Sequence, residues 1–190
     1  MKKGKIFILS GPSGSGKTSL YQAALKSSRL KRNIVKTISV TTRAKRLGEK
    51  HGLDYFFVSK RMFLFKKRQG HFLETQKVFD NYYGTPRRQV IDLLRVGKNV
   101  LLCIDVEGAK IVCRKFPRAV RIFIKTSSFG ILKKRLEGRG SETKKDMALR
   151  IRRAQKELRE ATQYKYVVIN DSFAKAVREL EGILVREIQG

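Results

Sequence analysis

The sequence predicts an α/β domain in which a parallel sheet core is flanked by helices. Four short apolar runs have the composition of strands buried on both faces, and longer stretches of helical pattern separate them. This alternation is typical of a parallel sheet covered by helices. A glycine-rich loop directly after the first strand supports the same fold. The strands are expected at 6–9, 100–104, 120–124 and 166–169, and the helices at 18–27, 86–96, 128–138, 143–161 and 173–187.

Two of these helices carry signals for their first residue. Thr85 stands directly before Pro86, which predicts an N-cap followed by proline at the first helical position. Thr143 and Asp146 resemble a capping box, so the next long helix is expected to begin there.

Two segments depart from the strand–helix alternation. Strands are expected at 35–41, 55–58 and 72–79, with one helix near 62–68. Strands so close together indicate a small insertion of mixed, more antiparallel character. The segment 132–150 is dense in charge and contains Gly138-Arg139-Gly140, which indicates a mobile lid. We therefore expect one domain, 1–190, with a core formed by 1–33, 84–131 and 151–190, an insertion at 34–83 and a lid at 132–150.

Length and charge narrow the class of protein. The 190 residues include 44 Lys and Arg against 16 Asp and Glu, a net charge of +28, and 41% are hydrophobic. No apolar run approaches the roughly 18 residues of a membrane span, and the one behind the basic first residues is too short for a signal peptide. Cys103 and Cys113 have no metal-type spacing, which favours a reducing, cytoplasmic location. The charge attracts phosphorylated molecules and, non-specifically, nucleic acid, but a solvated coat of lysines explains it equally well.

The motif G-x-x-x-x-G-K-T between the first strand and the first helix predicts a phosphate-binding loop, or P-loop. Its glycines let backbone N–H groups face inward at the positive end of a helix, where they can hold phosphate oxygens. Lys17 can reach the β- and γ-phosphates, and the Thr18 hydroxyl can bind Mg²⁺. The residues expected to bind a nucleoside triphosphate are Gly11, Ser13, Gly14, Ser15, Gly16, Lys17 and Thr18.

A second anion site is predicted in the insertion. Arg43 and Arg46 lie three apart in a loop after a strand, where two guanidinium groups could clamp a phosphate. Glu74 lies among apolar neighbours, and its carboxylate could accept hydrogen bonds from N1–H and the 2-amino group of guanine. Adenine offers no such pair of donors.

With these motifs the sequence resembles the guanylate kinase family over nearly its whole length. The matching motifs are GPSGSGKT, TTRxxRxGE, GxDYxFV, FLE, NYYGT, RLEGRG and VIND. The resemblance implies a P-loop kinase fold with a GMP-binding insertion and a lid. It also implies Mg²⁺-dependent phosphoryl transfer from ATP to GMP, giving ADP and GDP, with these nucleotides as the partners.

The same resemblance assigns roles to individual residues. Arg43, Arg46, Tyr55 and Tyr83 would bind the GMP phosphate, and Ser39, Glu74, Thr85 and Asp105 would read the guanine edge. Arg135, Arg139 and Arg150 match the lid arginines, Asn170 matches a residue near adenine, and Lys17 and Thr18 would serve the ATP phosphates and the metal. The residues expected to be catalytic are Lys17, Arg43, Arg135, Arg139 and Arg150.

Two positions depart from the family pattern. Lys45 stands where the family has proline, so the loop loses a fixed φ angle. Cys103 stands where the family has the first aspartate of D-x-D, the second being Asp105. If both lie on one strand, their side chains share a face. A neutral thiol cannot supply the charge of a carboxylate, so activity is reduced or another group compensates.

The chemistry expected here requires no strong general base, because the acceptor phosphate oxygen is already ionised. Catalysis then depends on positioning and on cations around the transferred group. His51 and His71 are accordingly expected to be surface residues. Two alternatives stay open: a kinase for another nucleoside monophosphate, and a catalytically weak protein of this fold that binds polyanions or partners.

Overall fold

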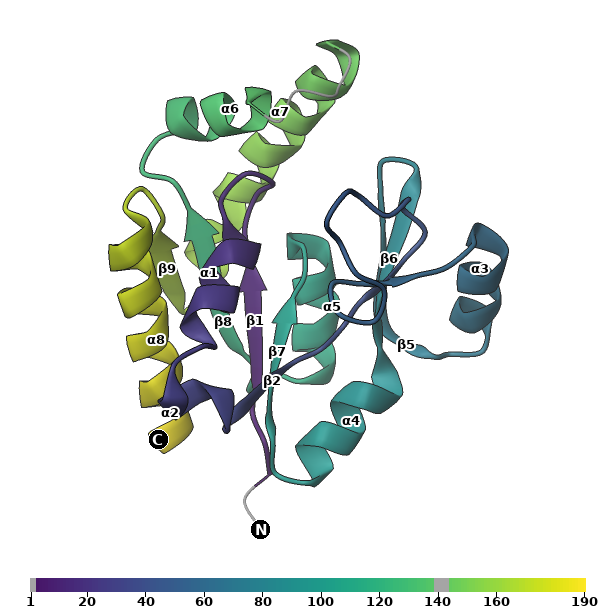
Figure 1. Cartoon of the computed structure of the whole chain (residues 1–190), viewed down its shortest axis with the longest axis vertical. Coiled ribbons are helices and arrows are strands. Elements are labelled where there is room, and N and C mark those ends of the chain that lie inside the picture. Colours follow the sequence, from purple (N-terminus) through teal and green to yellow (C-terminus); the bar gives the residue numbers. More distant parts are fainter. Residues whose placement is uncertain (1–2, 139–143) are drawn as a thin grey trace.

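The computed structural model describes residues 3–138 and 144–190, and its centre is a five-stranded sheet (Figure 1). The strand order is β2-β7-β1-β8-β9, and every neighbouring pair is parallel. The predicted fold class is confirmed. The strands are β1 (Ile6–Ser10), β2 (Ile34–Lys36), β7 (Asn99–Cys103), β8 (Val120–Lys125) and β9 (Tyr166–Ile169).

Helices cover both faces of this sheet, so the buried residues of its strands are almost all apolar. In β1, Phe7 and Leu9 pack towards one helical layer, while Ile6 and Ile8 pack towards the other. The first layer consists of α1 (Lys17–Ala24), α2 (Ser28–Lys31) and α8 (Phe173–Gln189). The second consists of α4 (Arg87–Arg95), α5 (Val106–Lys115) and the short 3₁₀ helix η1 (Glu160–Gln163).

A second, four-stranded sheet lies beside the first, in the order β4-β3-β6-β5. It mixes a parallel pair, β3–β4, with the antiparallel pairs β3–β6 and β5–β6, as expected for a mixed insertion. The strands are β3 (Val40–Thr41), β4 (Phe56–Phe57), β5 (Phe72–Val78) and β6 (Asn81–Pro86), and α3 (Lys60–Arg68) precedes β5. The single strand expected at 35–41 was wrong, because β2 belongs to the main sheet and β3 to the second one. The core, insertion and lid bounds given above stay a proposal.

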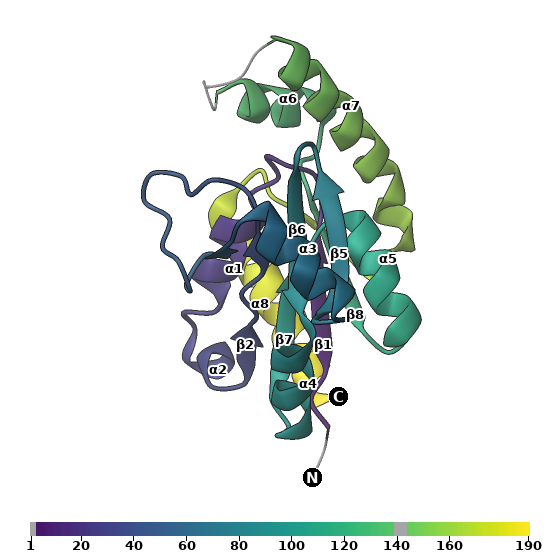
Figure 2. The ribbon, with the colours of Figure 1, turned by 90° about the vertical axis from the view of Figure 1, so that its right-hand side faces the viewer.

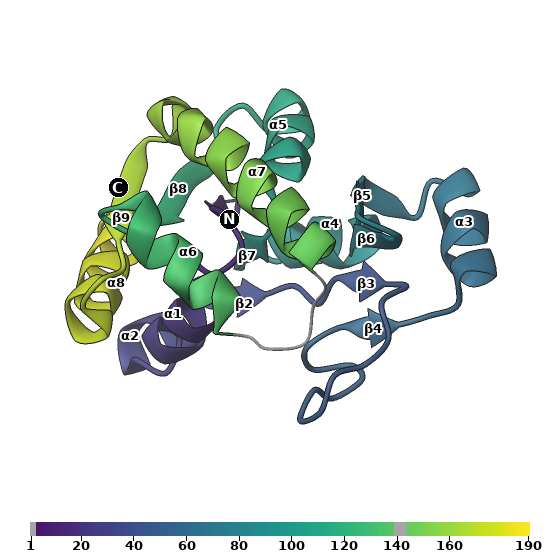
Figure 3. The ribbon, with the colours of Figure 1, turned by 90° about the horizontal axis from the view of Figure 1, so that it is seen from above.

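The helices α6 (Phe129–Glu137) and α7 (Lys144–Arg159) pack against each other above the carboxyl ends of the main strands (Figure 2). Seen from above, α7 crosses over the end of the main sheet, with its amino-terminal end towards the β5–β6 side (Figure 3). This pair contains most of the expected lid. The expected capping box at Thr143 and Asp146 lies outside the residues or side chains that the structure describes.

The start of α4 differs from the prediction. Thr85 is the fifth residue of β6, and Pro86 itself is the N-cap, with φ −58° and ψ 118°. The expected cap on Thr85 was therefore wrong, because its hydroxyl bonds to a buried carboxylate instead. Within the described part of the chain, no helix is long and apolar enough to cross a membrane.

Candidate active site

The glycines of the P-loop have backbone conformations that other residues rarely adopt. Gly11, Gly14 and Gly16 have φ values of 141°, 85° and 87°. A Cβ atom on Gly11 would lie 2.0 Å from the Ile124 carbonyl oxygen, and one on Gly16 would lie 2.2 Å from the Asn170 amide nitrogen. The loop can therefore keep this shape only with glycine at these two positions.

Lys17 begins α1, and its side chain turns back over the loop. Its Nζ donates to the carbonyl oxygens of Gly11 (2.6 Å) and Pro12 (3.0 Å). Ser13 and Thr18 are exposed at the same loop, whereas Ser15 is buried. The structure thus brings the predicted triphosphate-binding residues together at the end of β1, where the first helix begins.

Asn170, directly after β9, holds the P-loop through a side-chain hydrogen bond to its backbone. Its Nδ2 donates to the Ser15 carbonyl oxygen at 2.8 Å, and its backbone N–H donates to the Lys125 carbonyl oxygen at 2.7 Å. Its own carbonyl oxygen accepts from Arg135 Nη1 at 2.8 Å, so α6 is connected to the same loop. These contacts give Asn170 a structural task, and its expected place near adenine stays a prediction.

Arg43 lies in a partly buried site of aromatic and acidic groups. Its Nη2 bonds to Glu49 Oε1 at 2.6 Å, and its guanidinium carbon lies 5.6 Å from the Tyr55 ring centroid and 5.8 Å from that of Phe57. Tyr83 contacts Tyr55 edge to face, at 6.0 Å between ring centroids. Burial opposes the charge of Arg43, but Glu49 and Tyr83 outweigh it and raise the pKa of this side chain. The arginine is therefore charged and held in place.

Sequence reasoning missed the role of Glu49 in shaping this loop. One of its carboxylate oxygens accepts from Arg43, and the other accepts from the Arg46 backbone N–H at 2.8 Å. The loop is thus folded around one carboxylate, which explains how it holds together with Lys45 in place of proline. The Arg46 side chain is exposed, and Ser39 lies at the edge of the second sheet, where its carbonyl oxygen accepts from the Phe56 N–H.

Glu74 is a buried acid at the start of β5. Only 6% of it is exposed, and its Oε1 accepts from the Thr85 hydroxyl at 2.6 Å. Burial, together with the negative charge of Asp105, raises the pKa of Glu74 to about 7, although the Thr85 hydrogen bond opposes the shift. A Cβ on Gly108 would lie 2.9 Å from Glu74 Oε2 and 3.2 Å from Asp105 Oδ1, so both carboxylates lie against this glycine.

The prediction that Cys103 and Asp105 lie on one strand was wrong. The strand β7 ends at Cys103, and Asp105 is the N-cap of α5, accepting from the Gly108 N–H at 2.8 Å. Cys103 instead packs against the layer of α1 and α8. Burial raises the pKa of its thiol, although the charges of Lys17 and Lys36 oppose this, so the group is neutral at pH 7.

The helix α7 contributes contacts that sequence reasoning missed. Arg153 bonds to Asp105 and to Glu157, each at 2.8 Å, and its guanidinium lies 6.0 Å from the Phe79 ring. The guanidinium of Arg150 lies 5.5 Å from the same ring. The spacing of Arg153 and Glu157 signals a helical ion pair, but nothing in the sequence connects Arg153 to Asp105. Arg139, which was expected with Arg135 and Arg150 among the lid arginines, lies outside the described residues.

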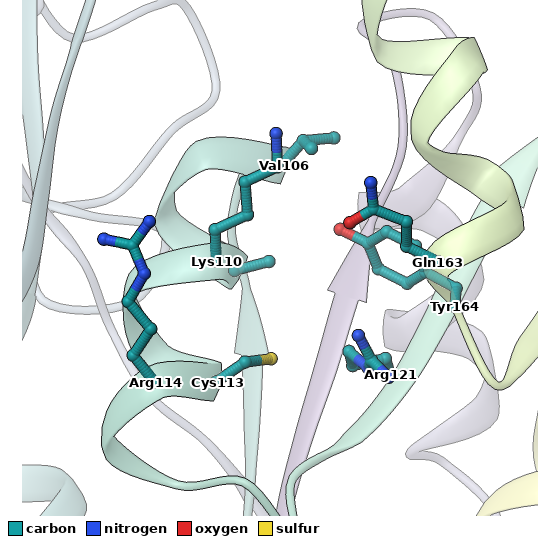
Figure 4. A pocket seen from close by; sticks show the side chains of 8 residues that line it. Val106, Lys110, Cys113, Arg114, Arg121, Gln163 and Tyr164 are labelled. Atoms are coloured by element: carbon teal, nitrogen blue, oxygen red, sulfur yellow. The ribbon is translucent and has the colours of Figure 1, made fainter.

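A hollow of about 410 Å³ separates α5 from η1 on another part of the surface (Figure 4). Three cations, Lys110, Arg114 and Arg121, line it together with Cys113 and Tyr164. It contains none of the residues predicted to bind nucleotides.

Fold and site together define a class of protein. A P-loop opens a helix at the carboxyl end of a parallel sheet, and a second sheet presents a charged arginine and a buried acid. This combination is that of a P-loop nucleoside monophosphate kinase.

Comparison with known proteins identifies the family. A model of the family described as guanylate kinase matches residues 3–187. The guanylate kinase of Rickettsia felis is 43% identical over 185 residues, which cover 97% of this chain and 95% of the relative. That of Clostridium acetobutylicum is 40% identical over 186 residues, covering 98% and 87%. A crystal structure of guanylate kinase from Anaplasma phagocytophilum superimposes with a TM-score of 0.79 at 32% identity, covering 100% of this chain and 89% of that one. The chain belongs to the guanylate kinase family.

Proposed function

We propose that the protein transfers the γ-phosphoryl group of ATP to GMP, giving ADP and GDP. The observation that carries this proposal is the buried pair of Glu74 and Thr85, which lies in the same sheet as Tyr83 and the neighbouring Arg43. An acid and a cation placed in this way suit the two ends of one nucleotide. Family membership supports the same reading.

Guanine recognition would depend on the ionised form of Glu74. A carboxylate can accept from both N1–H and the 2-amino group, whereas adenine presents no matching pair of donors. Asp105 and Thr85 lie against the same acid and would complete the site. A site built from buried acceptors rejects a base without the donors, because its polar groups would stay unpaired.

The GMP phosphate would bind at Arg43, with Tyr55 and Tyr83 beside it and Arg46 at the rim. Its oxygen is already ionised and needs no base, so the main obstacle is the repulsion between two anions. Lys17, at the P-loop, would oppose this repulsion on the ATP side. Arg135 and Arg150, which extend from α6 and α7, would add positive charge when the lid covers the nucleotides, as would Arg139.

The residues present fit a magnesium ion that arrives with ATP. Thr18 is an exposed residue at the start of α1, and Mg²⁺ commonly keeps several waters and binds through substrate phosphates with few protein ligands. Among the described residues, no three His, Cys, Asp or Glu side chains are grouped to hold a metal. When bound with ATP, the ion would neutralise charge on the β- and γ-phosphates. Cys103, a neutral thiol, is not proposed as a ligand.

Formation of ADP from ATP, measured with GMP, AMP, UMP and CMP in turn, tests the proposal. We expect turnover with GMP to exceed that with each of the others by at least about a hundredfold, because the buried acceptors would stay unpaired against a base without the matching donors. Equal or faster turnover of AMP would refute the guanine assignment.

Both cysteines are free thiols, which suits a cytoplasmic location.

A further inference from the structure

We propose that Arg153 is a positioning residue that joins the guanine site to α7 by holding Asp105 and Glu157 on one guanidinium group. The inference rests on the proposed function, because it assigns a task within the same site. It concerns a residue outside the motifs that suggested that function.

Arg153 contacts the two acids through different nitrogens. Its Nη2 bonds to Asp105 Oδ2 and its Nε bonds to Glu157 Oε1, both at 2.8 Å. The planar guanidinium group can make both bonds in one fixed geometry, and a lysine ammonium at this place could not span both acids in the same way. The three side chains are therefore held as a unit.

Asp105 is fixed from two sides by this arrangement. Its Oδ1 accepts from the Gly108 N–H at the start of α5, and its Oδ2 accepts from Arg153 on α7. The ion pair is only partly exposed, with 30% of the Arg153 side chain and 18% of the Asp105 side chain accessible. A guanine base that binds to Asp105 would thus bind to a carboxylate whose orientation is set before the base arrives.

Glu157 extends the same unit towards the P-loop. Burial raises the pKa of Glu157, whereas Arg153 and, at longer range, Lys17 favour its ionised form. Arg153 therefore joins Asp105, which belongs to the proposed guanine site, to Glu157, whose ionised form is favoured by the charge of Lys17. Its guanidinium also lies near Phe79, at the turn between β5 and β6.

Arg153 would also affect Glu74 indirectly, through its ion pair with Asp105. Two charged groups act on Glu74, namely Asp105, the N-cap of α5, and Lys115, the last residue of α5, and the Thr85 hydroxyl on β6 bonds to it. Arg153 balances the charge of Asp105. Without this balance Glu74 would take up a proton at a higher pH, and more of the enzyme would carry the form that cannot accept from guanine.

The test uses three variants of the full chain: Arg153→Gln, Arg153→Lys and, as a matched control, Arg152→Gln at the exposed neighbouring position on α7. Steady-state rates are measured with GMP and with ATP from pH 6 to 9. We expect Arg153→Gln to raise KM for GMP about tenfold, the scale of one charge-assisted hydrogen bond. KM for ATP should change less. The acid limb of kcat/KM for GMP should move to higher pH, and Arg153→Lys should restore the pH profile but only part of the GMP affinity.

A second readout does not depend on turnover. Titration of the Glu74 carboxyl group by ¹³C NMR in the free protein should show a higher pKa in Arg153→Gln than in Arg152→Gln. If the wild-type protein fails to use GMP, the proposed function is wrong, and this titration still decides the effect on Glu74. Equal KM values and equal titrations in the two glutamine variants would overturn the inference. A loss of activity without a change in either pH profile would reduce Arg153 to a structural residue. If Arg153→Gln does not fold, Arg153→Lys carries the test through its GMP affinity.

Discussion

Replacing Glu74 by glutamine should stabilise the protein above neutral pH while impairing its use of GMP. Glu74 is 94% buried, so its ionised form lies in a poorly solvated place with Asp105 nearby. Glutamine has nearly the same shape and can still accept from the Thr85 hydroxyl. The variant therefore removes a buried charge without opening a cavity.

The size of the effect follows from the pKa of Glu74. Burial raises this pKa from an ordinary value of 4.5 to about 7. The folded state therefore binds a proton more tightly than the unfolded state. The contribution of Glu74 to the free energy of unfolding is therefore fully present below pH 4.5 and is lost as the pH rises to about 7. Each pH unit in this window is worth about 1.4 kcal/mol, so the total loss is on the order of 3 kcal/mol.

Urea unfolding at pH 5 and pH 8 measures this effect. The free energy of unfolding of the wild-type protein should fall more between these values than that of Glu74→Gln, by up to about 3 kcal/mol. Other titrating groups contribute equally to both proteins and cancel in the comparison. Parallel pH dependences of the two proteins would show that Glu74 ionises as an ordinary acid, and the reasoning would fail.

Ionisation of Glu74 lowers the stability of the protein but should increase its activity with GMP. Wild-type kcat/KM for GMP should increase with pH up to about 7, because only the ionised acid accepts from guanine. The GMP phosphate itself titrates near pH 6, since second phosphate pKa values are about 6. Glu74→Gln serves as the control that shows this second titration alone, at a GMP efficiency lowered about a hundredfold. KM for ATP should be unchanged in the variant.

Three further predictions concern the two anion sites. Gly11→Ala should abolish ATP binding and lower the melting temperature, because its Cβ would lie 2.0 Å from a backbone carbonyl oxygen. The control is Gly182→Ala on α8, where a Cβ would meet open space, and this variant should raise the free energy of unfolding by about 0.5–1 kcal/mol. Glu49→Gln should loosen Arg43 and raise KM for GMP by about tenfold with little change in KM for ATP, and an unchanged KM for GMP would mean that Glu49 does not position the arginine. Cys103→Asp should raise kcat by about tenfold by placing a carboxylate beside the P-loop lysine, and an unchanged rate in a folded variant would show that the cysteine is no deficit.

Much of the main sheet could be predicted from the sequence, because parallel strands buried on both faces form short, mostly apolar runs. The strand at 166–169 matches β9 at both ends, and that at 120–124 is one residue short of β8. The run at 35–41 misled because its apolar pattern continues while the chain passes from one sheet to the other. The strand β6 was missed because Gly84 and Pro86 are typical of turns, although Pro86 falls where the strand ends and needs no ladder N–H.

The candidate site also has one part that the sequence predicts and other parts that only the folded structure reveals. The P-loop is visible in the sequence because its conformation is set locally by glycines and by the helix that follows. The contacts of Arg153 with Asp105 join residues 48 apart, and only the packing of α7 over the site brings them together. The role of Glu49 could not be predicted, because a carboxylate in a basic loop is usually a solvated surface charge. Only the structure shows its two hydrogen bonds, to the Arg43 side chain and the Arg46 backbone.

The hydrogen bond between Asn170 and Ser15 has a consequence for biosynthesis. It joins positions 155 residues apart, and Asn170 follows the last strand of the sheet. Chains emerge from the ribosome amino terminus first, so the glycine loop is made long before the strand that supports it. A nascent chain therefore carries the phosphate-binding loop before the side chain that supports it, and the loop gains this hydrogen bond only after residue 170 has been made and its strand has docked.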